Sequence, residues 1–227
     1  MGRMAEIKNN RRMKMIQFLQ DILKGTDKVL VRNLVILHTL IIAVSNYLVT
    51  IRFSLFAEKI NILGWETNFP LAAAAFTFPL VVVASDLTVR LIGKQSARAV
   101  VALAIVPAIV ASVLVLLYLG DKHAYRVGIA SGVAYGIGTV VDVYVFQHIR
   151  ERFKTNWWAA PALSMIVANI IDTYTFFYTA FYPQPWVHAV AFNNTMVKII
   201  VGQVVFVPAY GILLAYLAKK LNRKLVG

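Results

Sequence analysis

Three aspartates lie inside long apolar stretches of the sequence, and their chemistry needs an explanation. They are Asp86, Asp142 and Asp172. A carboxylate at the centre of a membrane helix costs roughly 2.5–3.5 kcal/mol on insertion scales, so such residues usually face a bundle interior or a water-filled cavity. We therefore expect the three aspartates to point inward and to mark an internal site for a small polar ligand.

The position of each aspartate within its stretch determines how strongly it indicates a ligand site. Asp172 lies about 12 residues into its stretch, or about 18 Å at 1.5 Å per residue, which is close to the membrane midplane. Asp86 and Asp142 lie only a few residues from the ends of theirs. Asp86 has a structural alternative because Arg90 follows at i+4 and can pair with it. Asp142 has Arg150 two turns further on. Asp172 is therefore the strongest candidate for a ligand contact.

Other polar and aromatic side chains share these stretches and complete a predicted site. Asn169 stands three residues before Asp172 and hence on nearly the same helix face. Lys198 has two interpretations, because a lysine near a helix end can also extend toward the membrane surface. The predicted substrate-binding residues are Asp172, Asn169, Asp142, Asp86, Asn46, Lys198, Tyr174 and Gln203.

A glycine repeat suggests where two helices approach each other closely. Gly128, Gly132 and Gly136 recur every four residues, which places them on one helix face. This pattern favours helix packing over direct ligand contact. We group these glycines with Arg90 as residues with a structural or gating role.

Several other kinds of chemistry lack their motifs. The chain has no cysteine, which excludes thiolate metal sites and a cysteine nucleophile. No G-x-x-x-x-G-K-[ST] string is present, and the four histidines are scattered without H-E-x-x-H spacing. The Tyr-Asp and Gly-x-Gly-Asp strings typical of intramembrane aspartyl proteases are also missing. We predict no metal, no cofactor and no enzymatic activity.

The elements that must position these residues are transmembrane helices. The chain is 59% hydrophobic with a mean hydropathy of +0.70, beyond what soluble domains show. A spanning helix needs roughly 20 apolar residues. Six stretches meet this length: Asn33–Ile51, Leu71–Val89, Ala99–Leu119, Val127–Gln147, Ala160–Tyr182 and Met196–Ala218. The predicted fold is an all-α integral membrane protein with a bundle of six transmembrane helices.

The positive charges predict the orientation of this bundle. The flanks on one side carry 18 of the 23 Lys and Arg residues, and the other side carries five. Cytoplasmic loops are enriched in these residues, so both termini are expected in the cytoplasm. The net charge of +13 then reflects topology, and no nucleic-acid partner is predicted.

This pattern divides the chain into three parts. Residues 31–219 are expected to form a six-helix transmembrane domain. Residues 1–30 are a basic cytoplasmic tail whose apolar residues recur at helical spacing, which fits either an interfacial helix lying on anionic lipid or a solvated tail. Residues 220–227 are a short basic cytoplasmic tail. No cleavable signal peptide is recognised.

The motifs along the chain resemble the queuosine precursor transporters, which belong with the vitamin uptake transporters. The resemblance covers all six helices, and one departure is that some members carry an acid where this chain has Asn193 and Asn194. The matching strings are Ser45-Asn46-Tyr47-Leu48, Thr77-Phe78-Pro79, Ser85-Asp86-Leu87-Thr88-Val89-Arg90, Val141-Asp142-Val143 with Phe146, Trp157-Trp158-Ala159-Ala160-Pro161, Asn169 with Asp172-Thr173 and Phe176-Phe177, and Lys198.

The resemblance implies import of 7-cyano-7-deazaguanine, 7-aminomethyl-7-deazaguanine or both, across the cell inner membrane, for queuosine salvage. A guanine-like edge presents adjacent N–H donors that a carboxylate can accept, and its flat ring can stack on Tyr or Phe. An alternative from another class is a substrate-binding subunit that needs energy-coupling partner subunits. The expected partners are the deazaguanine substrate and membrane lipid, and the sequence is compatible with a homodimer.

Overall fold

The computed structural model describes residues 13, 17, 28–54, 56, 58–62, 65–67, 70–153 and 156–220. Almost all of the amino-terminal tail and the segment 221–227 lie outside these residues, so the predicted interfacial helix stays a prediction. The helices are α2 (Lys28–Val49), η1 (Ala73–Phe76), α3 (Pro79–Tyr118), α4 (Ala124–Arg152), α5 (Ala159–Phe181), α6 (Val187–Val201), η2 (Gly202–Phe206) and α7 (Val207–Lys220). The strands are β1 (Arg52–Ser54), β2 (Ile60–Ile62), β3 (Trp65–Thr67) and β4 (Pro70–Ala72).

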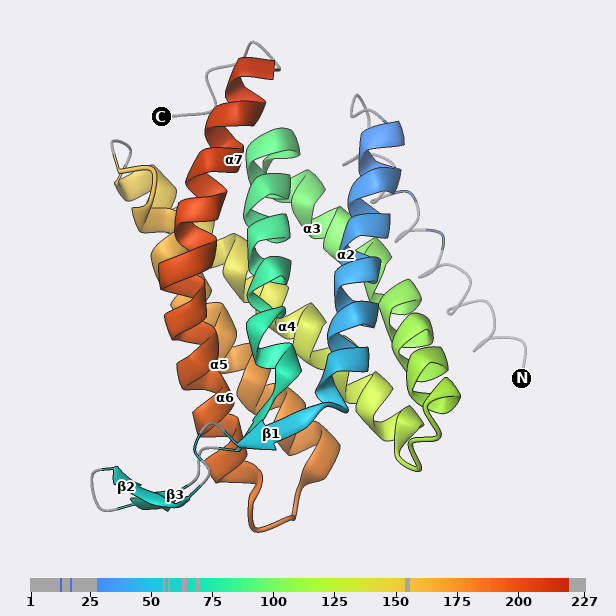
Figure 1. Cartoon of the computed structure of the whole chain (residues 1–227). Helices are drawn as coiled ribbons and strands as arrows, with labels where there is room; N and C mark the ends of the chain where they lie inside the picture. The colour runs from blue at the N-terminus through green and yellow to red at the C-terminus, as the bar shows by residue number, and fades with distance from the viewer. Residues whose placement is uncertain are drawn as a thin grey trace.

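The described residues contain five helical segments long and apolar enough to cross a membrane, as expected for a mainly helical membrane protein. One of them, Ala73–Tyr118, covers two of the six predicted stretches. Its helix α3 is interrupted at Gly93, whose backbone has φ 81° and ψ 163°, a conformation open almost only to glycine. The chain turns back at this bend (Figure 1). The count of six crossings stays a prediction.

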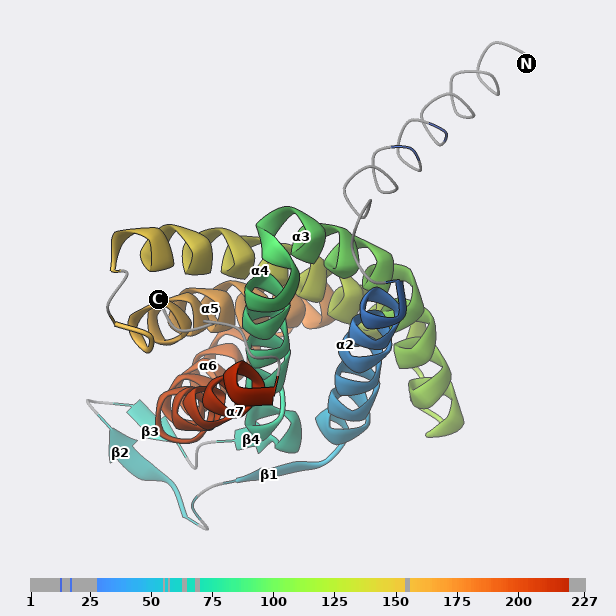
Figure 2. The same ribbon diagram turned by 90° about the horizontal axis from the view of Figure 1, so that it is seen from above.

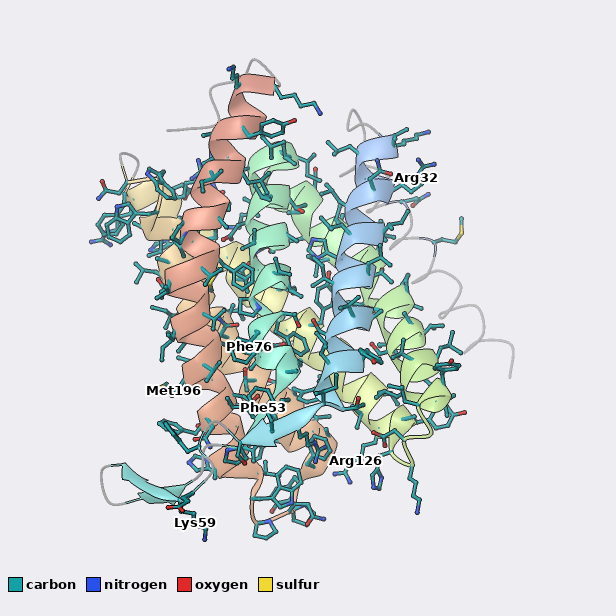
Figure 3. All side chains as sticks on the ribbon, viewed as in Figure 1. Arg32, Phe53, Lys59, Phe76, Arg126 and Met196 are labelled. Atoms are coloured by element: carbon teal, nitrogen blue, oxygen red, sulfur yellow. The ribbon has the colours of Figure 1, made fainter. Side chains whose placement is uncertain are left out.

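Both ends of the helical bundle are visible in the ribbon. The start of α2, the bend in α3 and the end of α7 lie at one end, and the strands lie at the other (Figure 1). Arg32 lies at the first end, and Lys59 and Arg126 lie at the second (Figure 3). The described parts of both chain ends therefore emerge on the same side of the bundle.

The connection between α2 and α3 contains strands that the sequence pattern did not predict. β1 pairs with β4, and β2 pairs with β3, both in antiparallel fashion. The β2–β3 pair projects from the side of the bundle (Figure 2). The predicted helix Leu71–Val89 begins later, because β4 and η1 take up its first residues and Pro79 occupies the first turn of α3. Proline fits this position because the missing N–H needs no helical partner there.

Two contacts fix this connection on the bundle. The Phe53 ring stacks on Phe76 with centroids 6.3 Å apart (Figure 3). The backbone N–H of Ala72 donates to Oδ1 of Asn194 at 3.2 Å, which ties β4 to α6. The strands thus hold the amino-terminal end of α3 over the helices that carry the predicted site.

Small residues let α4 lie close to α3 and α5. A Cβ built on Gly128 or Gly132 would overlap the side chains of Val113 or Ile109 on α3. At Gly136 the nearest atom would be Cδ1 of Ile105, at 3.2 Å. The glycine repeat therefore lies in the contact between α4 and the second half of α3.

Candidate functional site

A small cavity lies between α3, α4 and α5, and three of the predicted site residues line it. These are Asp142, Asn169 and Asp172. As their spacing on α5 predicts, Asn169 and Asp172 line the same cavity. The remaining lining residues are Phe78, Val81, Val82, Tyr135, Gly138, Thr139 and Ala168.

Asp172 forms an ion pair with Lys198 of α6. The Lys198 ammonium lies 2.8 Å from Oδ2 of Asp172, and the two side chains are 5% and 17% exposed. Lys198 also lies 4.2 Å from the centre of the Phe78 ring, where the negative face of the ring attracts a cation. Its side chain therefore faces the interior, and the alternative in which it extends to the membrane surface is wrong for this conformation.

Two buried polar groups of α5, one of which lines the cavity, have no internal partner. Nδ2 of Asn169 and Oγ1 of Thr173 are buried and accept or donate no hydrogen bond within the described residues. An unpaired buried polar group costs about 1–3 kcal/mol, so such atoms usually bind water or a ligand. The cavity therefore combines a carboxylate, an ammonium group and an amide that is ready to pair.

The cavity is small in this conformation. Its volume is about 20 Å³, which is enough for one water molecule and too small for a purine-sized ring. A ligand of that size can enter only after the surrounding side chains or helices move. The site must therefore widen before a ring of that size fits.

Gly138 allows α4 to approach Asp172 itself. A Cβ at this position would lie 3.0 Å from Cβ and 3.5 Å from Cα of Asp172. Both atoms belong to or adjoin the α5 backbone and cannot rotate away. The absence of a side chain at position 138 therefore sets the position of Asp172.

We expect Gly138→Ala to lower ligand affinity by about tenfold or more. Ordinary carbon contacts need about 3.5–4.0 Å, so Asp172 must shift by about 0.5 Å or more, and displacements of this order weaken a preorganised site. Titration of the purified protein with labelled ligand measures the effect. Gly136→Ala is the matched control, because its Cβ meets only the flexible end of Ile105. Equal affinities for the two variants would contradict this role for Gly138.

Asp86 and Asp142 form a second acidic group beside the cavity. Both are fully buried, and none of their four carboxylate oxygens has a partner of hydrogen-bonding geometry. The two carboxyls lie close enough to repel each other, and the Ser164 hydroxyl lies near both. Asp142 lines the cavity whereas Asp86 does not. Asp86 therefore does not line the cavity itself but adjoins Asp142, which does.

Arg90 points toward α7. Its Nε donates to the Tyr210 hydroxyl at 2.8 Å, and its guanidinium lies over the Phe146 ring at 5.6 Å. Its charge acts favourably on Asp86, although no hydrogen bond joins them. Arg90 therefore attracts Asp86 electrostatically without a hydrogen bond between them. The structural or gating role of Arg90 stays a prediction.

Three predicted ligand residues lie away from the cavity lining. Nδ2 of Asn46 donates to Ile42, Ser112 and Ser131, which links α2 to α3 and α4. Tyr174 stacks on Tyr178 and packs against His188 near the strand end of the bundle. Nε2 of Gln203 donates to the Ala162 carbonyl at 3.0 Å. For these residues the structure shows helix-to-helix contacts, and contact with a ligand stays a prediction.

The sequence pattern did not indicate that Tyr135 and His38 lie together at the cavity. Tyr135 lines the cavity, and its hydroxyl lies 3.0 Å from Nδ1 of His38. Nε2 of His38 lies 3.4 Å from the Thr88 hydroxyl. Phe78 was also missed as a lining residue. Their sequence signal is weak, because a lone histidine or aromatic residue in an apolar helix is equally common in a packed core.

Comparisons with known proteins identify what the chain is similar to. Residues 72–217 match the family model described as "Putative vitamin uptake transporter". The chain is 33% identical over 207 residues to the "Queuosine precursor transporter" of Escherichia coli K12, covering 82% of this chain and 87% of that protein. It is 34% identical to the "Probable queuosine precursor transporter" of Haemophilus influenzae, covering 82% and 86%. No solved structure matches.

Proposed function

Because this chain belongs to the queuosine precursor transporters, within the vitamin uptake transporter family, we propose that it imports 7-deazaguanine precursors of queuosine. It is a multi-pass membrane transporter and not an enzyme. The proposed cargo is 7-cyano-7-deazaguanine, 7-aminomethyl-7-deazaguanine or both. The observation that supports this cargo best is the buried Asp172–Lys198 pair, which borders a cavity with an unpaired amide.

The chemistry of this pair suits one edge of a guanine-like base. Such an edge carries a carbonyl oxygen next to ring and exocyclic N–H groups. Asp172 accepts from N–H groups, and Lys198 donates to a carbonyl oxygen. Asn169 supplies a further donor from the same helix face as Asp172. Hydrogen bonds to charged groups contribute more than those between neutral groups, so a base with this edge is preferred over one without it.

Uptake by purified protein in liposomes tests the proposal. We expect labelled precursor to enter, adenine, which lacks this edge, to enter much more slowly, and Asp172→Asn to abolish entry, because the amide offers a donor where the base needs an acceptor. Asp121→Asn is the matched control, since this aspartate lies between α3 and α4, where Oδ1 accepts from the exposed His123 N–H. Equal uptake of adenine and precursor would overturn the assigned cargo.

The same experiment separates a self-sufficient carrier from a binding subunit. A carrier moves precursor into liposomes without added proteins or ATP. A substrate-binding subunit binds precursor in detergent but gives no flux until its partner subunits are present. We favour the carrier, because the named relatives match over nearly their full length and are themselves called transporters.

The proposed topology has six crossings in the cell inner membrane with both termini cytoplasmic. Its support is the common end of the bundle for the start of α2 and the end of α7 (Figure 1), together with the excess of Lys and Arg on that side. Reporter fusions at the two chain ends should both give a cytoplasmic signal. An external signal from either fusion would contradict the count of six.

A further inference from the structure

The buried acids Asp86 and Asp142 carry an inference beyond the identity of the cargo. Each residue has 0% exposure, and their four oxygens have no hydrogen-bond partner within the part of the chain described. Two ionised carboxylates cannot stay close together in a low-dielectric interior unless cations balance both. The cations available nearby therefore decide the charge of this pair.

Only one of the two negative charges is balanced. Arg90 acts on Asp86 from one turn away. Within the described ranges, the groups that act on Asp142 are the hydroxyls of Ser85 and Ser164, which carry no positive charge. Lys198, the nearest cation on α6, is bound to Asp172 at 2.8 Å.

The other titratable groups around the pair do not supply a second positive charge. From α7, the Tyr210 hydroxyl accepts from Arg90. From α4, Arg150 interacts with Arg90, Tyr210 and Glu151. From α2, His38 is engaged by Thr88 and Tyr135.

We propose that Asp86 and Asp142 hold one proton between them and that this proton is released when the substrate binds in the adjoining cavity. Asp142 lines the cavity, so a ligand there places its N–H groups or its ammonium group beside the carboxyl. Donors and cations favour the ionised form. Binding therefore drives the proton off the pair. The release half of this proposal rests on the proposed function, and the bound proton does not.

The bound proton is tested on the ligand-free protein by infrared spectroscopy. A protonated buried carboxyl gives a carbonyl stretching band that shifts in D₂O. We expect this band in the natural protein and in Asp121→Asn, and its loss in Asp142→Asn, because Arg90 balances the Asp86 carboxylate that is left. Measuring the natural protein across a pH range gives the same answer if a variant fails to fold, since the band should disappear reversibly at high pH. The proposal would be overturned if the band were absent at every pH. It would also be overturned if Na⁺ raised the stability of the protein and no band were present.

Proton release is tested by precursor binding at several pH values. If one proton leaves on binding, the dissociation constant falls by up to tenfold for each unit of rising pH while the free pair is protonated. Asp142→Asn should bind more weakly and without this pH dependence. A pH-independent affinity of the natural protein, with the band present, would overturn proton release alone. A band in a protein that binds no precursor would overturn the proposed cargo and leave the bound proton in place.

Discussion

Lys198→Gln is expected to lower the free energy of unfolding by about 3–5 kcal/mol, because it leaves the Asp172 carboxylate buried without its cation. The ammonium group is 2.8 Å from Oδ2 of Asp172 and also lies over the Phe78 ring. Asp172→Asn removes the opposite charge and should also be destabilising, since it leaves Lys198 unpaired. Thermal unfolding in detergent and the yield of folded protein measure both effects.

The double variant Asp172→Asn with Lys198→Gln separates folding from recognition. Two neutral amides can hydrogen-bond to each other and leave no unpaired charge, so most of the lost stability should return. Precursor binding should not return, because neither the carboxylate nor the ammonium is present. A double variant no more stable than the single variants would show that the two charges are not coupled. A double variant that binds precursor normally would remove the pair from the site.

This expectation revises what the sequence suggests about Asp172. Taken alone, Asp172→Asn replaces a costly carboxylate with a cheaper amide, so normal folding is the natural prediction. The structure adds a partner that is 26 residues away and on another helix. The position of Asp172 near the midplane is a prediction from helix length, whereas its partner depends on how α5 and α6 pack.

The same distinction explains which other parts could be predicted. The helices follow from apolar length, and the shared face of Asn169 and Asp172 follows from helix periodicity. Sequence alone does not reveal that the Asn46 amide joins three helices, because a buried amide with that role looks, in sequence, like one that faces a ligand. The strands β1 and β4 were missed because the Leu71–Ala75 segment is apolar in either conformation. Nothing local indicates that Arg90 meets Tyr210, which is 120 residues away.

Close packing of α4 against the second half of α3 is a further requirement of the fold. Gly132 provides the tightest point, since a Cβ there would overlap the Ile109 side chain at Cγ1 and Cδ1. Gly132→Ala should therefore lower the free energy of unfolding by about 1–3 kcal/mol through overpacking. Ile109→Ala should lower it by about 2–5 kcal/mol, because it leaves a cavity in the same contact.

The two substitutions together should cost less than the sum of their separate effects. The alanine at position 132 fills part of the space that Ile109 leaves, so a positive coupling of about 0.5–3 kcal/mol is expected. Gly136→Ala provides the control, because its nearest neighbour is the movable Cδ1 of Ile105 at 3.2 Å, and it should change stability by less than Gly132→Ala. The free energy of unfolding in detergent is measured for the natural protein, the two single variants, the double variant and Gly136→Ala. Strict additivity would mean that α3 and α4 do not meet at Gly132.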